Sequence, residues 1–408
     1  MTGSNQYHQI IETIIQEIDD NTHKFTNPSV EDGSMGLAIF YYYCHKYYNT
    51  KVFLTKAEEM IDVSIQLLSK ISHEAAFTVK YKGDSLSNLI ASFGKGMLFV
   101  ENTLGYKYDF TQYYEMIDEI LVDLSYKSIE ERDFDFFSGA LAAGHYFINK
   151  FNIYKDETSR HTLLNIYNAL VKSGLSDIPD QIYWKAPAYS DQVYLGISHG
   201  SAMIINFIVK LFKIGIFNQN DISQKQILEK AINFVMSQKT DFEMGYFPHV
   251  YKSDNNIEPT IFAMCYGDLG VLYALKFSSV IIDDIRLMEE VDLILEKSSK
   301  RKKDIQHTVD ASLFYGASGV YCIYRSLYSN TNDPFFKKVY KYWYSQILTY
   351  QDINQKFRAG FTFFINDDDN DSYTQYSFGW GLAGLGICLL LDLDNDLPLL
   401  DEILLFGL

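Results

Sequence analysis

The sequence predicts an all-α fold, an α/α toroid of seven repeats in which each buried inner helix is paired with an amphipathic outer helix. Three observations lead to this fold class. A short element of small residues recurs seven times, each copy opens an apolar stretch of helical length, and amphipathic segments lie between the copies. The chain has only seven prolines in 408 residues, which suits long helices because proline breaks them.

The recurring element has small residues at its first and fourth positions. Its seven copies occupy positions 33–36, 91–94, 139–142, 200–203, 267–270, 316–319 and 381–384. The fourth copy is the loosest, because Met203 replaces a small residue there. Small residues permit a close approach of the backbone. Each copy is therefore expected to mark the start of an inner helix.

Each copy leads into an apolar segment, and a more polar segment follows it. Inner helices are expected over segments such as Leu37–Tyr43, Val271–Leu275 and Val320–Leu327. Outer helices are expected over Ala57–Lys70, Thr111–Leu124, Gln224–Met236 and Phe335–Tyr350, where apolar residues recur at helical spacing. One such pair cannot bury its inner face alone, whereas seven in succession can. The alternative is an open helical solenoid, which is less favoured because the aromatic-rich inner segments need a shared centre.

Two segments interrupt the helical pattern. Thr240–Phe262 contains Gly245, Pro248 and Pro259 and is expected to form loops with up to two short strands. Phe361–Tyr376, with its acidic run, is expected to be a surface loop. Neither segment is long enough for a separate domain, so residues 1–408 are expected to form a single domain.

Charge and composition exclude several classes of function. The net charge of −17 repels nucleic-acid phosphates and anionic lipid, so neither is an expected partner. No apolar run reaches the ~18–20 residues of a membrane helix, and no secretory signal is visible. The four cysteines are widely spaced, which predicts reduced thiols in a cytoplasmic protein. Two of them, Cys44 and Cys388, lie in apolar helices and are expected in the core.

Several copies also carry longer motifs. Residues 195–200 are LGISHG, residues 264–270 are MCYGDLG, and residues 377–384 are SFGWGLAG. These resemble the G-x-[AS]-H-G, W-C-Y-G-x-x-G and closing G-L-A-G motifs of the lanthionine synthetase C-like family, the cyclases of lanthipeptide biosynthesis. Asn27 to Ala38 resembles the opening element, so the resemblance covers essentially the whole chain. Met264 departs from the pattern, because the family has Trp there.

The resemblance also implies a zinc site that this chain has lost in part. In the family, zinc is held by the cysteine of the fifth copy and by a Cys-His pair in the sixth. Here Phe314 and Tyr315 stand in place of that pair, and Cys265 alone cannot make a zinc site, which needs about three protein ligands. We therefore expect no zinc and no other cofactor. His307 and Cys322 are weaker candidates for replacement ligands. The family's arginine four residues before the cysteine is Ile261 here.

The family reaction is the Michael addition of a peptide cysteine thiol to dehydroalanine or dehydrobutyrine, which closes a thioether ring. His199 matches the family's catalytic histidine, and Asp135, four residues before Gly139, matches its catalytic acidic residue. A histidine pKa near neutrality suits proton transfer. The alternatives are a His199 that bonds a backbone carbonyl in a helix-start turn and an Asp135 that caps the third inner helix.

Three further residues are expected in the substrate pocket: Cys265, Tyr266 and Tyr315. Cys265 is either a small core residue or a thiol on the substrate side. Tyr315, at the position of the family's zinc-ligand histidine, either lines the pocket as a phenol donor or packs against neighbouring residues.

The leading functional hypothesis is a zinc-independent cyclase that acts on a dehydrated precursor peptide, with a lanthipeptide dehydratase as a candidate partner. Without zinc, a thiol of pKa about 8.5 is still on the order of 3–10% ionised near neutral pH, and confinement of the two peptide ends contributes more. The second hypothesis is a non-catalytic scaffold that binds the precursor or the dehydratase. The third is an enzyme that adds glutathione or another small thiol to dehydrated residues.

Overall fold

The computed structural model describes residues 3–74, 85–240, 245–251, 260–301, 308–364 and 373–404. Fourteen α-helices lie within these ranges. The described residues of Thr240–Phe262 contain no strand, only an isolated β-bridge between Tyr194 and Val250, so the expected short strands are not found there. In the segment Phe361–Tyr376, residues 365–372, which include the acidic run, lie outside the described residues. None of the described helices is both long enough and apolar enough to cross a membrane.

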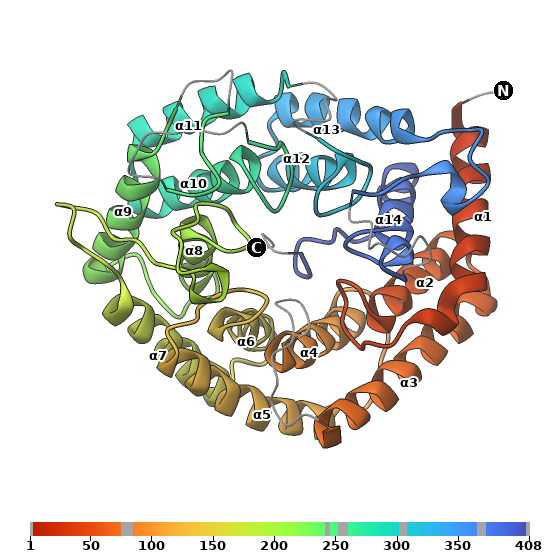
Figure 1. Ribbon diagram of the computed structural model, residues 1–408, viewed down its shortest axis with the longest axis horizontal. Helices are drawn as coiled ribbons and strands as arrows, with labels where there is room; N and C mark the ends of the chain where they lie inside the picture. The colour runs from red at the N-terminus through yellow and green to blue at the C-terminus, as the bar shows by residue number, and fades with distance from the viewer. Residues whose placement is uncertain are drawn as a thin grey trace. The chain divides into compact units, whose positions relative to one another are not determined.

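The chain divides into two compact units. Unit 1 comprises residues 1–76, 99–107 and 303–400, and unit 2 comprises residues 77–98, 108–302 and 401–408. The helices of unit 1 are α1 (Gly3–Asn21), α2 (Ser34–Tyr48), α3 (Lys51–Glu74), α12 (Ala317–Thr331), α13 (Pro334–Ile347) and α14 (Leu382–Leu393). In this unit α2 packs against α3 and α14, and α12 packs against α13 and α14 (Figure 1).

Unit 2 holds the remaining helices. They are α4 (Leu86–Asn102, whose last turn belongs to unit 1), α5 (Thr111–Glu130), α6 (Ala140–Tyr154), α7 (Glu157–Ser173), α8 (Ser201–Lys213), α9 (Ile222–Ser237), α10 (Asp268–Ile282) and α11 (Ile285–Ser298). The helices α6, α8 and α10 contact one another in sequence, and α5, α7, α9 and α11 pack against them.

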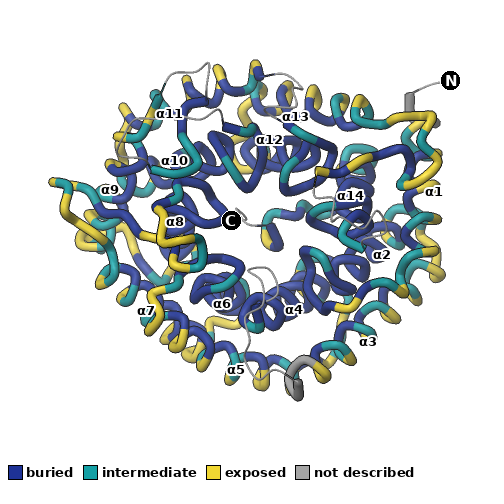
Figure 2. The backbone as a smooth tube through the Cα atoms, viewed as in Figure 1, coloured by how far each residue is buried: buried dark blue, intermediate teal, exposed yellow. Residues whose placement is uncertain are grey.

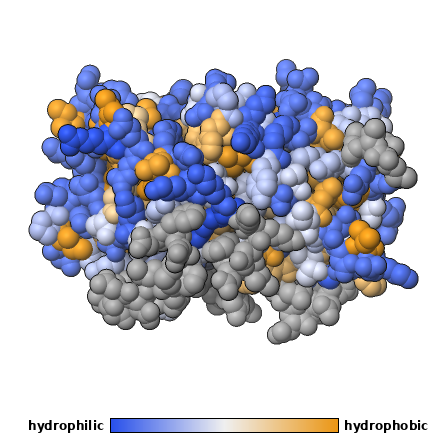
Figure 3. Space-filling view, turned by 90° about the horizontal axis from the view of Figure 1, so that it is seen from above, coloured by the Kyte–Doolittle hydropathy of each residue, from blue (hydrophilic) through white to orange (hydrophobic). Residues whose placement is uncertain are grey.

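Alternate helices differ in burial as the sequence predicts. The helices that follow the small-residue elements are buried along most of their length, whereas α3, α5, α9 and α13 expose one side (Figure 2). All four predicted outer segments fall on these exposed-sided helices, the last continuing into a 3-10 turn at Leu348–Tyr350. The face seen in Figure 3 is mainly hydrophilic with scattered apolar residues, as the composition implies.

In six copies of the small-residue element the first glycine is the N-cap of a buried helix. These N-caps are Gly33, Gly139, Gly200, Gly267, Gly316 and Gly381. The chain before each helix folds back over the glycine. At Gly316, for example, an added Cβ would lie under 3.0 Å from the backbone nitrogen of Ser312 and the backbone oxygen of Asp310. Glycine is required there because real Cβ contacts do not come so close.

The second copy corrects the prediction. The helix α4 begins at Leu86, and Ala91–Gly94 lies inside it rather than at its start. The Ser85 hydroxyl accepts a hydrogen bond from the Asn88 N–H at 3.0 Å, which caps the first turn. A small residue is needed at position 94 for a different reason, because the Tyr146 ring lies where a Cβ would be.

The residue before each N-cap glycine has a distinctive position. Asp32, Ser138, Tyr266, Tyr315 and Trp380 are each partly exposed between two buried neighbours. The sixth such residue, His199, is buried but borders the same kind of turn. In these six repeats, one side chain therefore stands directly before the N-cap glycine of the buried helix.

Candidate active site

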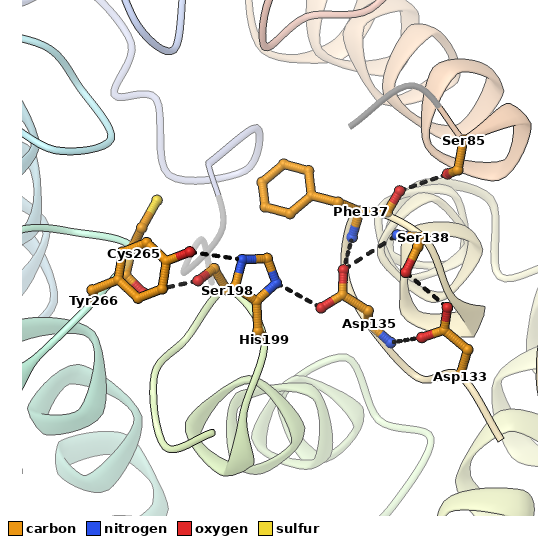
Figure 4. Close-up of polar contacts among 9 residues, drawn as sticks. All are labelled: Ser85, Asp133, Asp135, Phe137, Ser138, Ser198, His199, Cys265 and Tyr266. Carbon is orange, nitrogen blue, oxygen red and sulfur yellow. Dashed lines mark hydrogen bonds and ion pairs between the residues drawn. The ribbon is translucent and has the colours of Figure 1, made fainter. Parts of the chain in front are cut away.

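Asp135 lies in the turn that precedes α6, and its carboxylate is held from several sides (Figure 4). Its Oδ1 accepts the backbone N–H groups of Phe137 at 2.8 Å and Ser138 at 3.2 Å. Its own N–H donates to Oδ1 of Asp133 at 3.0 Å. The helix N-cap alternative for Asp135 is wrong, because the N-cap of α6 is Gly139 and no side chain caps that helix.

His199 is bonded at both ring nitrogens. Its Nδ1 lies 2.7 Å from Oδ2 of Asp135, and its Nε2 lies 3.1 Å from the Tyr266 hydroxyl. The His199 side chain is only 6% exposed and that of Asp135 only 1%. Since a carboxylate accepts, Nδ1 carries a hydrogen. When the imidazole is neutral, its Nε2 therefore accepts a hydrogen bond from the Tyr266 phenol. The carbonyl-bonding alternative for His199 is wrong, because its partners are a carboxylate and a phenol.

The repeat explains why these residues meet. His199 and Tyr266 directly precede the N-cap glycines of α8 and α10, which pack against each other in unit 2. The Ser198 hydroxyl donates to the carbonyl oxygen of Cys265 at 3.0 Å and ties the two turns together. Gly267 has a φ of 75°, a left-handed conformation that favours glycine and sets the direction of the Tyr266 turn.

Aromatic rings surround the His199 imidazole. The centroid of the Tyr189 ring lies 4.0 Å from that of His199, with Phe137 at 5.7 Å and Tyr194 at 6.1 Å. Burial, and then the Asp135 charge, raise the pKa of Tyr189, so it remains a neutral phenol. The sequence did not indicate Tyr189 or Tyr194, because they come from the connection between α7 and α8, which carries no repeat signal.

Cys265 lies next to the site but is buried. It is 1% exposed, and burial raises the pKa of its thiol. Its sulfur points away from the His199 ring in Figure 4. These observations favour the interpretation of Cys265 as a small core residue over a thiol on the substrate side.

Tyr315 belongs to unit 1, where it forms part of an aromatic cluster. Its ring is stacked on Trp380 with centroids 5.1 Å apart and planes at 27°. Phe314 meets Trp380 edge-on at 4.5 Å, and Phe364 lies 5.8 Å from Tyr315. The two residues that stand in place of the family's zinc ligands thus both contact Trp380.

Among the residues that the structure describes, the donor atoms do not assemble into a zinc site. In the described part of the chain no group of three or more His, Cys, Asp or Glu residues could hold a metal ion. His307 lies outside the described residues, and the Cys322 sulfur faces that of Cys388 at 3.5 Å inside unit 1. The expectation of a reaction without a cofactor remains a prediction.

The chain is similar to a known family in sequence and to known proteins in structure. The family model described as lanthionine synthetase C-like protein matches residues 24–405. Nisin cyclase has a similar structure, with a TM-score of 0.73 and 16% identity over 99% of this chain and 98% of the other. Cellobiose 2-epimerase from Bacillus thermoamylovorans B4167, at a TM-score of 0.42 and 10% identity over 95% of this chain and 98% of its own, is too distant to inform the fold. No curated protein matches the sequence.

These findings confirm the predicted fold class. The chain is an all-α protein with the α/α toroid fold that it shares with nisin cyclase. Because the family model covers most of the chain, the protein belongs to the lanthionine synthetase C-like family.

Proposed function

We propose that the protein is a peptide cyclase that closes (methyl)lanthionine rings in a dehydrated precursor peptide without zinc. The observation that carries the proposal is the buried arrangement of Asp135, His199 and Tyr266. It offers a proton-transfer group at the start of the buried helices, the position at which the repeat presents side chains. Family membership and the fold of nisin cyclase support the same reaction class.

The reaction moves one proton and forms one bond. The peptide cysteine loses its proton, the thiolate sulfur bonds to Cβ of the dehydroamino acid, and the π electrons pass to Cα and the carbonyl as an enolate. Protonation of Cα completes the thioether. Nε2 of His199, as imidazolium, is the proposed donor of that proton, and the thiol proton restores it.

Asp135 would position His199 and stabilise its charge. Its carboxylate is fixed by two backbone N–H groups, so it holds Nδ1–H in one orientation and leaves Nε2 for proton transfer. A carboxylate on Nδ1 also stabilises the imidazolium that forms during the reaction. The Tyr266 phenol, at 3.1 Å from Nε2, can accept a hydrogen bond from imidazolium or donate one to neutral imidazole.

The test follows the peptide thiols. A dehydrated precursor with cysteines is incubated with the protein, then alkylated with iodoacetamide and analysed by mass spectrometry. A cyclase protects the cysteines from alkylation without a change in peptide mass, since ring closure is an isomerisation. Fragmentation should show no cleavage within the rings.

Other outcomes would contradict the proposal. Peptide that binds but stays fully alkylatable would favour the scaffold hypothesis. Adducts that form only when glutathione is added would indicate addition of an external thiol. A dehydratase that must be present for protection would instead support the cyclase and add that partner to it.

A further inference from the structure

A second set of side chains at helix starts lies in unit 1. Asp32, Tyr315 and Trp380 directly precede the N-cap glycines of α2, α12 and α14, and each is the partly exposed residue of its turn. Backbone hydrogen bonds join the three turns. The Gly379 N–H donates to the Glu31 oxygen at 2.6 Å, and the Phe314 N–H donates to the Gly379 oxygen at 3.1 Å. Glu31, Gly379 and Phe314 directly precede Asp32, Trp380 and Tyr315 in the sequence. The side chains of Asp32, Trp380 and Tyr315 therefore belong to neighbouring turns.

Two of these side chains form a fixed aromatic surface. Tyr315 is stacked on Trp380, and Phe314 supports Trp380 edge-on. Phe364, which lies beside Tyr315, is 63% exposed. Aromatic faces attract cations placed within about 6 Å, Trp most strongly. The rings are already packed against one another, so little side-chain freedom is lost when a ligand binds.

The third side chain adds a negative charge. Oδ1 of Asp32 accepts hydrogen bonds from Nδ2 of Asn27 at 2.7 Å and from the Ser29 hydroxyl at 2.6 Å. Both of these donors are neutral, and they hold the carboxylate in place. Asp32 follows Glu31, whose turn is bonded to the turn that carries Trp380. A carboxylate on a turn that adjoins those of the aromatic side chains attracts a cation and repels an anion. The net charge of −17 gives the whole protein the same preference.

We propose that Asp32, Tyr315 and Trp380 form a cation-binding surface that holds a lysine or arginine side chain of the peptide substrate. Phe314 and Tyr315, at the two positions where the family has zinc ligands, would then help to bind the substrate peptide instead of a metal. The proposal rests on the proposed function only in taking the cation to belong to the substrate peptide.

Trp380 provides a direct readout. It is the partly exposed tryptophan, whereas Trp184 is 5% exposed and Trp343 is fully buried. The probe is the peptide acetyl-Gly-Arg-Gly-Arg-Gly-amide, compared with the same peptide carrying citrulline, which is neutral and nearly isosteric with arginine. The arginine peptide should change the tryptophan fluorescence saturably and bind about 3- to 30-fold more tightly than the citrulline peptide. Added salt should weaken the binding.

Variants are measured by calorimetry, because Trp380→Leu removes the fluorescent group. Trp380→Leu and Tyr315→Leu should each weaken binding of the arginine peptide by about 3- to 30-fold. Asp32→Asn keeps a side chain of the same size. It should weaken binding of the arginine peptide and make that binding less dependent on salt. Asp396→Asn is the matched control, since it removes an exposed charge from the same unit. It should bind as the wild type does.

Several results would overturn the proposal. They are equal binding of the arginine and citrulline peptides, unchanged binding by folded Trp380→Leu and Tyr315→Leu proteins, and no saturable binding of the arginine peptide. His199→Asn separates this proposal from the proposed function, because it should slow thioether formation by about 100- to 10,000-fold and leave binding of the arginine peptide intact. Binding without any thioether formation in the wild type would retain the surface and reject the cyclase.

Discussion

The His199 side chain is fixed at both of its ring nitrogens. A carboxylate holds one nitrogen, a phenol contacts the other, and Tyr189 lies against the ring. A histidine that served only to pack a turn would not need a buried carboxylate that is itself held by two backbone N–H groups. This arrangement explains why we assign His199 the proton transfer and Asp135 the positioning of His199.

Substitutions should rank these residues. His199→Asn should lower the rate of thioether formation by about 100- to 10,000-fold, the usual contribution of general acid–base catalysis. Asp135→Asn should lower it less, because an amide oxygen can still accept from Nδ1 but carries no charge. Tyr266→Phe removes one hydrogen bond and should lower it about fivefold. The rates are measured by alkylation and mass spectrometry in single-turnover time courses.

The control for these variants is Tyr194→Phe, whose ring lies 6.1 Å from His199 between centroids. It should leave the rate unchanged. A Tyr266→Phe rate as low as that of His199→Asn would mean that the phenol, and not the imidazole, delivers the proton.

Residues in the repeated motifs could be predicted from the sequence, and the others could not. His199, Asp135 and Tyr266 lie at fixed offsets from the N-cap glycines, so their positions follow from the motif. Tyr189 comes from a connection with no repeat, held by a 3-10 turn at Pro187–Tyr189 and left-handed residues at Ser190 and Asp191. Only the folded chain shows that it reaches the imidazole.

At the scale of the helix, the small-residue element determines where each buried helix starts. The preceding turn folds over the N-cap glycine, and backbone atoms occupy the space that a side chain would need. The prediction failed only at the second copy, where the small residues admit the Tyr146 ring from α6 instead. The same pattern of small residues thus accommodates either a backbone turn or an aromatic ring. The spacing of the copies alone does not distinguish these two cases.

Gly316→Ala tests this role. Its Cβ would lie under 3.0 Å from backbone atoms, so we expect a loss of about 2–4 kcal/mol in the free energy of unfolding, measured by urea denaturation. Gly144→Ala is the matched control. It lies inside α6 with only side chains near its Cβ, the nearest at 3.2 Å, so its effect should stay within about 1 kcal/mol. Equal effects would show that the turn can relax.

At the scale of the whole molecule, unit 2 buries basic groups. Nζ of Lys210 on α8 lies 3.1 Å from Nδ1 of His145 on α6. Burial lowers the pKa of Lys210 well below 10.5, and the charges of Lys95 and Lys213 lower it further. In the unfolded chain the amine regains its ordinary pKa and binds a proton. Lys210 therefore makes the protein more stable as the pH rises towards 10.5.

Lys210→Met should remove this dependence. Between pH 7 and pH 9 the wild-type free energy of unfolding should rise relative to that of the variant, by at most about 1.4 kcal/mol per pH unit. Lys172→Met, at an exposed lysine of α7, should keep the wild-type slope. Urea denaturation at several pH values measures it. Parallel pH profiles for wild type and Lys210→Met would mean that Lys210 stays protonated in the folded protein.

The fold class was predictable because seven copies of one pattern extend over the chain, and the likeness to nisin cyclase confirms it. The chemistry was less predictable, since Phe314 and Tyr315 replace ligands without showing what they do instead. Their contacts with Trp380 became visible only in the folded protein.

If the chain closes thioether rings without zinc, a chelator should leave the reaction unchanged. A dehydrated precursor is incubated with the protein with and without EDTA, and the free thiols are counted by alkylation and mass spectrometry. The cysteines should be protected at the same rate in both samples. Protection that is lost in EDTA and restored by added zinc would instead show that ring closure needs the metal.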